Sequence, residues 1–274
     1  MKKYILLIIV ISLFSKMCLA GTIEDAKEAL NNKQYSKAFK LYKQEALKGN
    51  AEAQHKIGNM YNNGDGRSRD QSEAIKWYKL AADQGYVEAQ SSLGFALYNK
   101  DFNEALVWFK KAADGGDIHT ILFVAAHYSI ASNNSEALNW YKMAAANGDV
   151  ESNYTIGLIY EKGDGVLQDI NEAQKWYEFA AENGYIPAIH SLGLAYREKY
   201  LKERFVFEEN IILAHMFLNI CAASSHYTRH FCIIERNTTS KYYMNDEQIK
   251  RALEAAKICS SRNYKNCKQI VKAN

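Results

Sequence analysis

Seven histidines and a late group of cysteines are the residues of this sequence whose types could hold a metal ion. The closest grouping is His226, His230 and Cys232, which are spaced four and then two residues apart. Imidazole and thiolate groups both bind zinc, but a cysteine that is oxidised to a disulfide no longer coordinates as a thiolate. The sequence also has no HExxH, no GxSxG, no Gly-rich phosphate loop and no paired cysteines at zinc spacing. We therefore predict no metal, no cofactor and no catalytic residues.

Carboxylates recur at one position of a repeated pattern. They stand near the start of successive predicted helices, where a negative charge stabilises the helix N-terminus, and we interpret them in this way rather than as catalytic acids. They are Glu73, Glu104, Glu136 and Glu172. Gly-Asp-Gly occurs at 64–66 and again at 163–165. One carboxylate per turn is far below the oxygen ligands that calcium requires, so we predict turns there.

One phrase, Ala-x-x-Trp-Tyr-x-x-Ala-Ala-x-x-Gly, is repeated along the chain. It predicts helices that would position any site. It is clearest at 74–85 and returns with small changes at 105–116, 137–148 and 173–184, with looser copies at 38–49 and 214–222. All four tryptophans of the chain occupy the same position in it. Offsets of 3, 4, 7 and 8 place these residues on one helix face, and the closing Gly suits a helix C-terminus. We predict that the aromatic residues pack helix against helix.

Another helix precedes each phrase and is the first helix of the pair. Its pattern is Ala-x-x-x-Ile/Leu-Gly-x-x-Tyr. Glycine inside a helix costs about 1 kcal/mol relative to alanine, so small residues in register need a physical reason. We expect that they permit close approach of the neighbouring helix. This position, called the glycine slot below, holds Gly58, Gly94, Ala125, Gly157 and Gly193.

Counting from each closing Gly gives repeats of 30 to 40 residues with two helices each, which is the pattern of an α-solenoid. The sequence therefore predicts an all-α, right-handed solenoid of helical hairpins in one elongated domain. The predicted divisions are a signal peptide at 1–20, an N-terminal helical unit at 21–48, repeats at 49–84, 85–115, 116–147, 148–183 and 184–224, and a C-terminal helical cap at 225–274.

The two full units, from Ala53 to Gly85 and from Ser152 to Gly184, resemble Sel1-like repeats, which are relatives of tetratricopeptide repeats with longer loops. The resemblance covers about 49–224. The tail also resembles the ending of many bacterial Sel1-type proteins, with a final helix that begins after Asn245 and closes near a Cys-x7-Cys pair. Asn245 is a plausible N-cap of that helix, and with Gln248 three residues later the pattern is close to that of a capping box. The units at 85–115 and 116–147 depart from the pattern because they lack the Gly-Asp-Gly loop.

In tetratricopeptide-like units the first helix of each pair lines the concave face, and the resemblance implies the same here. The residues three before and one after the glycine slot would face that groove, in two rows. Phe95, Leu122, Tyr154, Leu158 and Leu194 form a mostly apolar strip, which suits an extended or helical peptide. The alternative is that the strip is buried against the solenoid itself or a second copy. The predicted groove residues are His55, Asn59, Ser91, Phe95, Leu122, Tyr154, Leu158, His190 and Leu194.

The first twenty residues are predicted to be a secretory signal peptide that is cleaved after Ala20. Lys2 and Lys3 precede an apolar run from Ile5 to Phe14, which is too short to span a membrane comfortably. Without the signal peptide the chain has equal numbers of basic and acidic residues, so nothing global points to nucleic acid. Residues 225–274 nevertheless carry 10 Lys or Arg against 4 Asp or Glu.

The four remaining cysteines all lie in the last quarter of the chain, and export would place them in an oxidising compartment. Four cysteines allow three pairings. We favour Cys259–Cys267, which would close a local loop at a helix end, and Cys221–Cys232, which would join neighbouring helices.

An insertion from Tyr200 to Asn210 lengthens the last repeat, where a regular unit has a short turn. Phe205 and Phe207 would lie on that loop, either as a plug for the end of the solenoid or as a contact site.

The most consistent interpretation is a non-catalytic, periplasmic or secreted scaffold that binds a protein or peptide in its groove. The resemblance allows envelope proteins or host factors as partners. The balanced charge predicts no nucleic-acid partner, and the short apolar run predicts no stable membrane span after signal cleavage. Two alternatives remain, a ligand binder or weak hydrolase of the cell-wall or β-lactam type and a self-assembling structural envelope protein.

Overall fold

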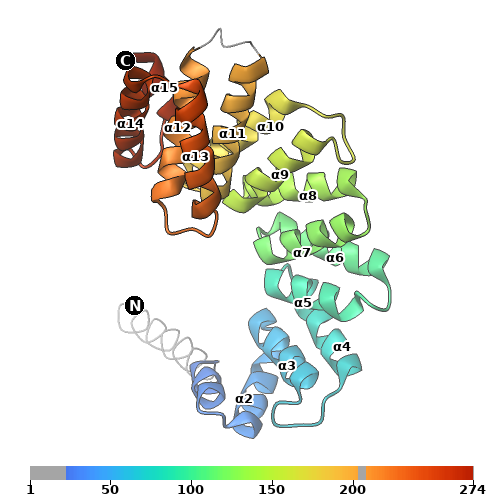
Figure 1. Cartoon of the computed structure of the whole chain (residues 1–274). Helices are drawn as coiled ribbons and strands as arrows, with labels where there is room; N and C mark the ends of the chain where they lie inside the picture. Colours follow the sequence, from blue (N-terminus) through green and yellow to red (C-terminus); the bar gives the residue numbers. More distant parts are fainter. Residues whose placement is uncertain (1–22, 203–207, 274) are drawn as a thin grey trace, which may run out of the picture. The chain divides into compact units, whose positions relative to one another are not determined.

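The computed structural model describes residues 23–202 and 208–273. The predicted signal peptide, and Phe205 and Phe207 of the predicted insertion, lie outside the described residues. The described chain is helical throughout and contains no strand, which confirms the predicted all-α class (Figure 1). Among the described residues, none of the helices combines the length and apolar character needed to cross a bilayer.

A short helix over residues 23–31 precedes the numbered helices. These are α2 (Tyr35–Leu47), α3 (Ala51–Asn63), α4 (Gln71–Ala82), α5 (Val87–Leu97), α6 (Phe102–Asp114), α7 (Ile118–Ile130), α8 (Asn134–Ala146), α9 (Val150–Lys162), α10 (Ile170–Glu182), α11 (Ile186–Lys202), α12 (Glu208–Ala223), α13 (Arg229–Tyr243), α14 (Asp246–Ser261) and α15 (Cys267–Ala273).

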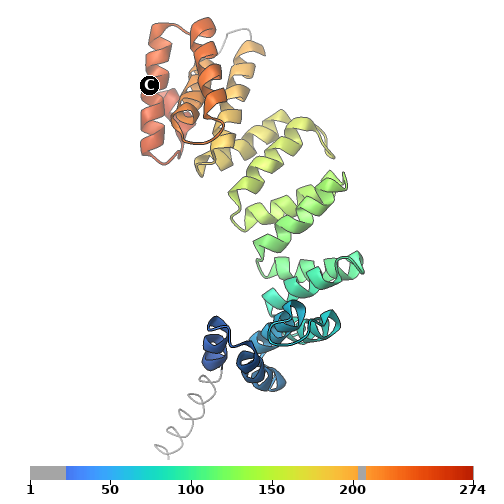
Figure 2. The same cartoon turned by 60° about the horizontal axis from the view of Figure 1, so that its bottom comes forward.

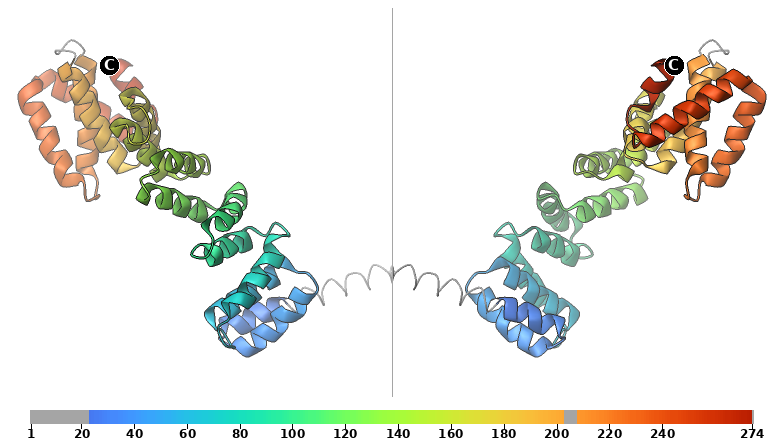
Figure 3. Two further views of the ribbon diagram at one scale, coloured as in Figure 1. Left: turned by 90° about the vertical axis from the view of Figure 1, so that its right-hand side faces the viewer. Right: turned by 90° about the vertical axis from the view of Figure 1, so that its left-hand side faces the viewer.

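The chain divides into two compact units, and the boundary between them falls within the α7 sequence. Unit 1 runs to Thr120 and unit 2 begins at Ile121. In unit 1, α2 packs against α3, α3 against α4, α4 against α5 and α5 against α6, so successive hairpins stack (Figure 2). In unit 2, α8 to α12 continue the same pattern, and α13 and α14 both pack against α12 at the end of the unit (Figure 3).

Where the slot holds glycine, it receives a ring or apolar side chain from the second helix of the same hairpin. A Cβ placed on Gly58 would lie 2.5 Å from the ring of Tyr78. The same test on Gly94 gives 2.5 Å to the ring of Phe109, and a Cβ on Gly157 would come within 2.4 Å of the ring of Tyr177. Real Cβ atoms essentially never approach so closely. The expectation that the slot permits close helix approach is therefore confirmed.

The last copy of the slot shows the same geometry with an aliphatic partner. A Cβ on Gly193 of α11 would lie 2.7 Å from Cγ of Leu218 in α12. In unit 2 the remaining copy is Ala125, and Tyr141, the aromatic at the matching position of the next helix, is only partly buried. By contrast, Tyr78, Phe109 and Tyr177 are 3% exposed or less. The repeat whose slot holds alanine thus has the more exposed aromatic residue at this position.

The tryptophans pack less uniformly than the following aromatic residues. Trp108 and Trp140 are buried, whereas Trp77 and Trp176 are only partly buried. The indole Nε1 of Trp176 donates to Glu172 of the same helix. The residue after the tryptophan position, not the tryptophan itself, is the one that enters the glycine slot.

The turns follow the predicted chemistry. The closing glycines have φ between +79° and +93°, where an L side chain is strained; they are Gly49, Gly85, Gly116, Gly148 and Gly184. In the Gly-Asp-Gly loops the second glycine approaches the preceding second helix. A Cβ on Gly66 would lie 2.8 Å from the Tyr35 backbone, and one on Gly165 would lie 2.9 Å from Asn134 and Ser135. These loops therefore join consecutive repeats within each unit.

The second helices begin with Asp or Asn caps, each followed three residues later by one of the recurrent glutamates. Asp70, Asp101, Asn133 and Asp169 accept a hydrogen bond from the backbone N–H of Glu73, Glu104, Glu136 and Glu172, respectively. These glutamates stand in the first turn of their helices. Their place agrees with a role at the helix N-terminus.

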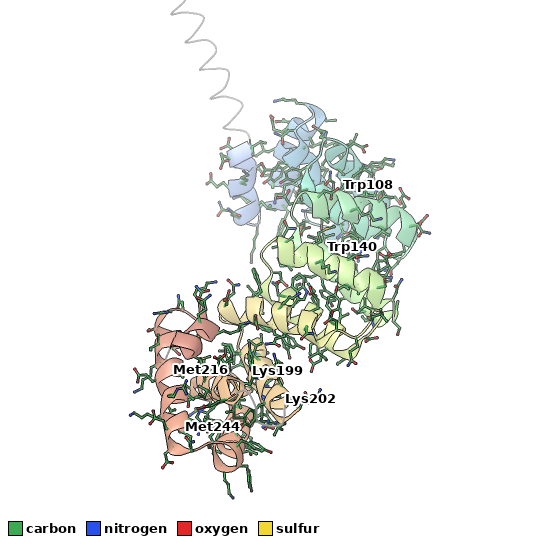
Figure 4. All side chains as sticks on the ribbon, turned by 90° about the horizontal axis from the view of Figure 1, so that it is seen from above. Trp108, Trp140, Lys199, Lys202, Met216 and Met244 are labelled. Carbon is green, nitrogen blue, oxygen red and sulfur yellow. A yellow bond between two sulfur atoms is a disulfide. The ribbon has the colours of Figure 1, made fainter. Side chains whose placement is uncertain are left out.

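The cap is a tightly packed group of helices at the end of unit 2. Most of α12 is buried, and Met216, labelled in Figure 4, is fully enclosed. Disulfides join Cys221 to Cys232, with Cα atoms 5.8 Å apart, and Cys259 to Cys267, with Cα atoms 5.0 Å apart. These are the pairs that the sequence favours. Asn245 and Gln248 form the expected capping box at the start of α14.

The predicted insertion begins later than expected. Residues 200–202 belong to α11, and Tyr200 is 7% exposed, so it packs as part of a long helix rather than in a loop. At the other end, Glu208 to Asn210 already form the first turn of α12.

We predict that Gly157→Ala destabilises unit 2 by about 1–3 kcal/mol, because the new methyl group must displace the Tyr177 ring. The gain in helix propensity, about 1 kcal/mol, offsets part of this cost. Urea denaturation followed by circular dichroism measures the change in the free energy of unfolding. In a Tyr177→Leu background the cost should shrink. An equal cost in both backgrounds would show that the ring is not the obstacle.

Removal of the Cys259–Cys267 disulfide by the double change Cys259→Ser, Cys267→Ser should lower the free energy of unfolding by about 2–3 kcal/mol, because a short loop in the unfolded chain is released. Urea denaturation under oxidising conditions measures the effect. The variant should lose further stability on addition of dithiothreitol, since Cys221–Cys232 remains. Unchanged stability of the double variant would contradict this assignment of energy.

Candidate functional site

The predicted groove residues gather around the rings that enter the glycine slots. In unit 1, the Tyr78 ring lies 5.8 Å from the ring of His55, which stands three residues before Gly58. Its hydroxyl donates to Oδ1 of Asn59, the residue after Gly58, at 2.8 Å. In the next hairpin, Phe95, the residue after Gly94, meets the Phe109 ring edge-on at 5.1 Å. The inserted ring thus holds residues of both predicted rows.

Asn59 and Phe95 line one hollow of about 300 Å³ in unit 1, and they come from consecutive first helices, α3 and α5. Tyr78 and Ser92 also contribute to its wall, together with Asn62 and Gln71. Phe95 is 43% exposed. The hollow therefore offers an apolar ring beside amide and hydroxyl groups, a combination that suits a peptide segment with both backbone and side-chain contacts.

His55 is one of the predicted groove residues, but its side chain is buried, at only 8% exposed. Its Nε2 lies 3.0 Å from Oγ of Ser92, and its ring also contacts that of Tyr86 at 5.4 Å. Burial lowers the pKa of His55 to about 4, and the nearby Lys56 acts in the same direction. His55 is therefore a neutral ring at pH 7 that packs against the rings of Tyr78 and Tyr86.

Ser91 is also engaged within unit 1. Its hydroxyl lies 2.6 Å from that of Thr120, and Oγ1 of Thr120 donates to Asp117 at 2.7 Å. Burial opposes ionisation of Asp117, but hydrogen bonds from Thr120 and Ser91 outweigh it and lower the pKa of the carboxyl group. This chain of hydroxyl groups holds the start of α7 against α5.

In unit 2, Tyr154 has the position that His55 has in unit 1. Its ring lies 5.5 Å from the inserted ring of Tyr177 and 5.4 Å from that of Tyr185. Leu158 is partly buried and packs against the core of the unit. Tyr154 and Leu158 therefore combine a structural role with partial exposure, and Leu122 is partly buried as well.

The α11 residues of the predicted rows lie in a different setting. Leu194 lines a hollow of about 280 Å³ with Ser191, Tyr177 and the lysines at the end of the helix, of which Lys199 and Lys202 are labelled in Figure 4. His190 is partly buried, and among the described residues its Nε2 has no hydrogen-bond partner. Burial lowers the pKa of His190.

Two tyrosines of this arrangement are not among the predicted groove residues. Tyr86 and Tyr185 each follow a closing glycine, and each places its ring against the residue three before the glycine slot. The signal was available, since both occupy the same repeat position. Burial raises the pKa of Tyr185 to about 12.

A polar network that joins α10, α11 and the tail was not predicted from the sequence. Glu178 accepts hydrogen bonds from Tyr196 at 3.0 Å and from Lys268 at 2.7 Å. Lys268 is ninety residues away along the chain, so no local pattern marks the contact. These residues border an open hollow of about 450 Å³.

The histidine and cysteine grouping that first suggested a metal is engaged otherwise. Cys232 is in a disulfide, and Nδ1 of His226 lies 2.9 Å from the hydroxyl of Thr228. Over residues 23–202 and 208–273, no group of three or more His, Cys, Asp or Glu side chains is placed to hold a metal ion.

The model of the Sel1 repeat matches this chain at 32–50, 51–86, 87–117, 127–149 and 150–185, which together exceed half of its length. The chain belongs to the Sel1 repeat family. Repeats of this family generally act as scaffolds for protein–protein interaction and are typically non-catalytic. The matches at 51, 87 and 150 begin at the starts of α3, α5 and α9. Beyond 185, α11 and α12 repeat the slot geometry through Gly193 and Leu218.

Two solved structures illustrate the likeness. A protective antigen of uropathogenic Escherichia coli strains, which displays an SLR fold, is 23% identical with a TM-score of 0.55, over 93% of this chain. This chain spans 56% of the length of that protein. A Sel1 repeat protein from Oxalobacter formigenes is 27% identical with a TM-score of 0.49, over 86% of this chain and 99% of that one. The comparison with curated proteins found no match.

The buried histidines predict a pH-dependent stability. The pKa of His55 and that of His215 in α12 are both lowered to about 4, with burial as the main cause, against 6.5 in the unfolded chain. Because the unfolded chain takes up protons first as the pH falls, stability is full above about pH 6.5 and declines towards pH 4. Each group contributes a slope of at most about 1.4 kcal/mol per pH unit.

Urea denaturation at several pH values between 4 and 7 measures this slope. The double variant His55→Gln, His215→Gln should show a shallower slope, and His230→Gln at an exposed position controls for the loss of an imidazole. A slope that is the same in the double variant and in the original chain would contradict the assignment.

Proposed function

We propose that this protein is an exported, non-catalytic scaffold that binds a protein or peptide partner in the concave groove, along the two predicted rows of its first helices. The observation that carries the proposal is the hollow in unit 1, where Asn59 and Phe95 from consecutive first helices stand side by side and partly exposed. Tyr78 fixes the amide of Asn59, and the Phe109 ring supports Phe95. Preorganised groups of this kind lower the entropic cost of binding.

The chemistry of the two hollows favours a peptide over a small charged ligand. In unit 1 the wall offers amides and hydroxyl groups, which match backbone N–H and C=O groups, around one exposed aromatic ring. In unit 2 the hollow at Leu194 adds charged groups of both signs, including Glu161, Glu198 and Lys199. A segment with apolar and polar side chains in alternation fits both surfaces.

Export is part of the proposal and rests on two features. The first residues have the composition of a secretory signal peptide. The disulfides at Cys221–Cys232 and Cys259–Cys267 point to an oxidising, extracytoplasmic environment. A periplasmic or secreted location agrees with both, and envelope or host proteins are the partners within reach there.

Site-specific photo-crosslinking in the native cell tests the proposal. A photoreactive amino acid at position 95, and separately at position 194, should capture the same partner. The matched controls are positions 107 and 179, where Val107 and Phe179 are each 53% exposed on second helices, away from the predicted rows.

The variant Phe95→Asp, Leu194→Asp should then lose capture by at least about tenfold, because a charge would have to be desolvated at the contact. Circular dichroism checks that its helicity is unchanged. Equal capture from the row and control positions, or full capture by the double variant, would contradict the proposed groove.

A further inference from the structure

The exposed face of α13 carries a row of large apolar side chains that nothing in the described protein covers. Tyr227, just before the helix, is 80% exposed, Phe231 is 60%, Ile234 is 49% and Tyr242 is 64% exposed. Within α13, spacings of three and eight residues place Phe231, Ile234 and Tyr242 on one side of the helix. Tyr227 stands in the turn that precedes the helix. Cys232 and Thr239, which lie about 100° around the helix from the row, are fully buried, and α13 packs against α12.

We call this row of exposed side chains the α13 stripe; Figure 1 shows α13 beside α12 in the cap. Within α13, the helix rises about 16 Å from Phe231 to Tyr242. The stripe is thus a long, convex, straight surface. It is separate from the proposed groove residues, and it lies in the cap, beyond the residues that match the family model.

The charges around the stripe are predominantly positive. Arg229 is exposed beside Tyr227, and helical spacing puts Lys241 along one edge of the stripe. The Lys241 ammonium lies 5.1 Å from the centre of the Tyr242 ring. The single acidic residue of α13, Glu235, forms an ion pair with Arg197 of α11 and is thereby neutralised. The surface therefore has complementary charge to an anionic partner.

From this stripe we infer a second function: the exposed face of α13 docks onto an anionic lipid bilayer surface. Phenylalanine and isoleucine would enter the boundary between headgroups and acyl chains. The tyrosines at the two ends of the stripe would keep their hydroxyl groups at headgroup level, as amphipathic rings do at membrane interfaces. Lys241 and Arg229 would contact the anionic headgroups, each contributing at close range.

The shape of the stripe favours a bilayer over a folded partner. A protein would need a groove of matching length, with acidic groups along its edges, to cover a convex row of this kind. A bilayer interface adapts to a convex, straight helix without such a groove. The excess of basic residues in 225–274, 10 against 4, acts in the same direction.

The binding test uses the chain from residue 21, so that the predicted signal peptide does not contribute, and vesicles of two compositions. One contains phosphatidylcholine alone and the other contains phosphatidylcholine with phosphatidylglycerol. Cosedimentation should show binding to the phosphatidylglycerol vesicles that weakens as salt is added. The variant Phe231→Ser, Ile234→Ser should bind at least about tenfold more weakly, since two apolar side chains no longer enter the interface.

The matched control is Val107→Ser, Phe179→Ser, which removes two equally exposed apolar side chains outside the stripe and should leave binding unchanged. Lys241→Glu should weaken binding roughly tenfold, and only for the anionic vesicles. If the double stripe variant loses helicity, Tyr227→Ser takes its place, because Tyr227 lies outside the helix and is mostly exposed.

The inference is overturned if the chain binds neither type of vesicle, or if the stripe and control variants bind equally well. It is also overturned if light scattering shows, without lipid, that the chain self-associates and that the stripe variant abolishes this association. The stripe would then be an interface between copies of the protein. None of these outcomes bears on the groove, because positions 95 and 194 are unchanged.

Discussion

The insertion of one side chain from the second helix into a glycine on the first is the contact on which the rest of this fold depends. Tyr78, Phe109 and Tyr177 can reach the backbone of the facing helix only because no Cβ stands in the way. The helices of each hairpin are thereby held close, and the paired alanines beside the rings complete the interface, since Ala74, Ala81, Ala173 and Ala180 are essentially fully buried. Close packing at this density makes every added methyl group consequential.

The same contact organises the candidate binding surface. The ring that enters the slot touches the residue three before the glycine and the residue after it, which are the two predicted groove rows. In unit 1 the hydroxyl of Tyr78 orients Asn59, and in unit 2 the hydroxyl of Tyr177 donates to Glu161. Stability and presentation of the surface are therefore coupled through one side chain per repeat.

Much of this could be predicted from the sequence, because the fold repeats local rules. Helical periodicity, cap residues and glycines with positive φ act within one or two turns of chain. The disulfide pairs could be favoured for the same reason, since each closes a short loop. One local feature could not be predicted. The sequence alone does not show which of two adjacent rings, Trp77 or Tyr78, enters the glycine slot.

Contacts between distant segments could not be predicted. The burial of His55 depends on Ser92 and Tyr86 from the next hairpin, and the Glu178 network depends on Lys268 from the tail. The exposed stripe on α13 was hidden for a related reason. Its apolar residues have the spacing of a core face, and only the packing of Cys232 and Thr239 against α12 shows that this face points outward.

The central claim is that the ring in the glycine slot holds each hairpin together and positions the rows beside it. Hydrogen exchange measured by mass spectrometry on Gly157→Ala tests this most directly. The account predicts faster exchange in α9 and α10, including the segment with Tyr154 and Leu158, while α3 to α6 of unit 1 stay protected. Unchanged protection in α9 and α10, or an equal loss throughout the chain, would contradict it.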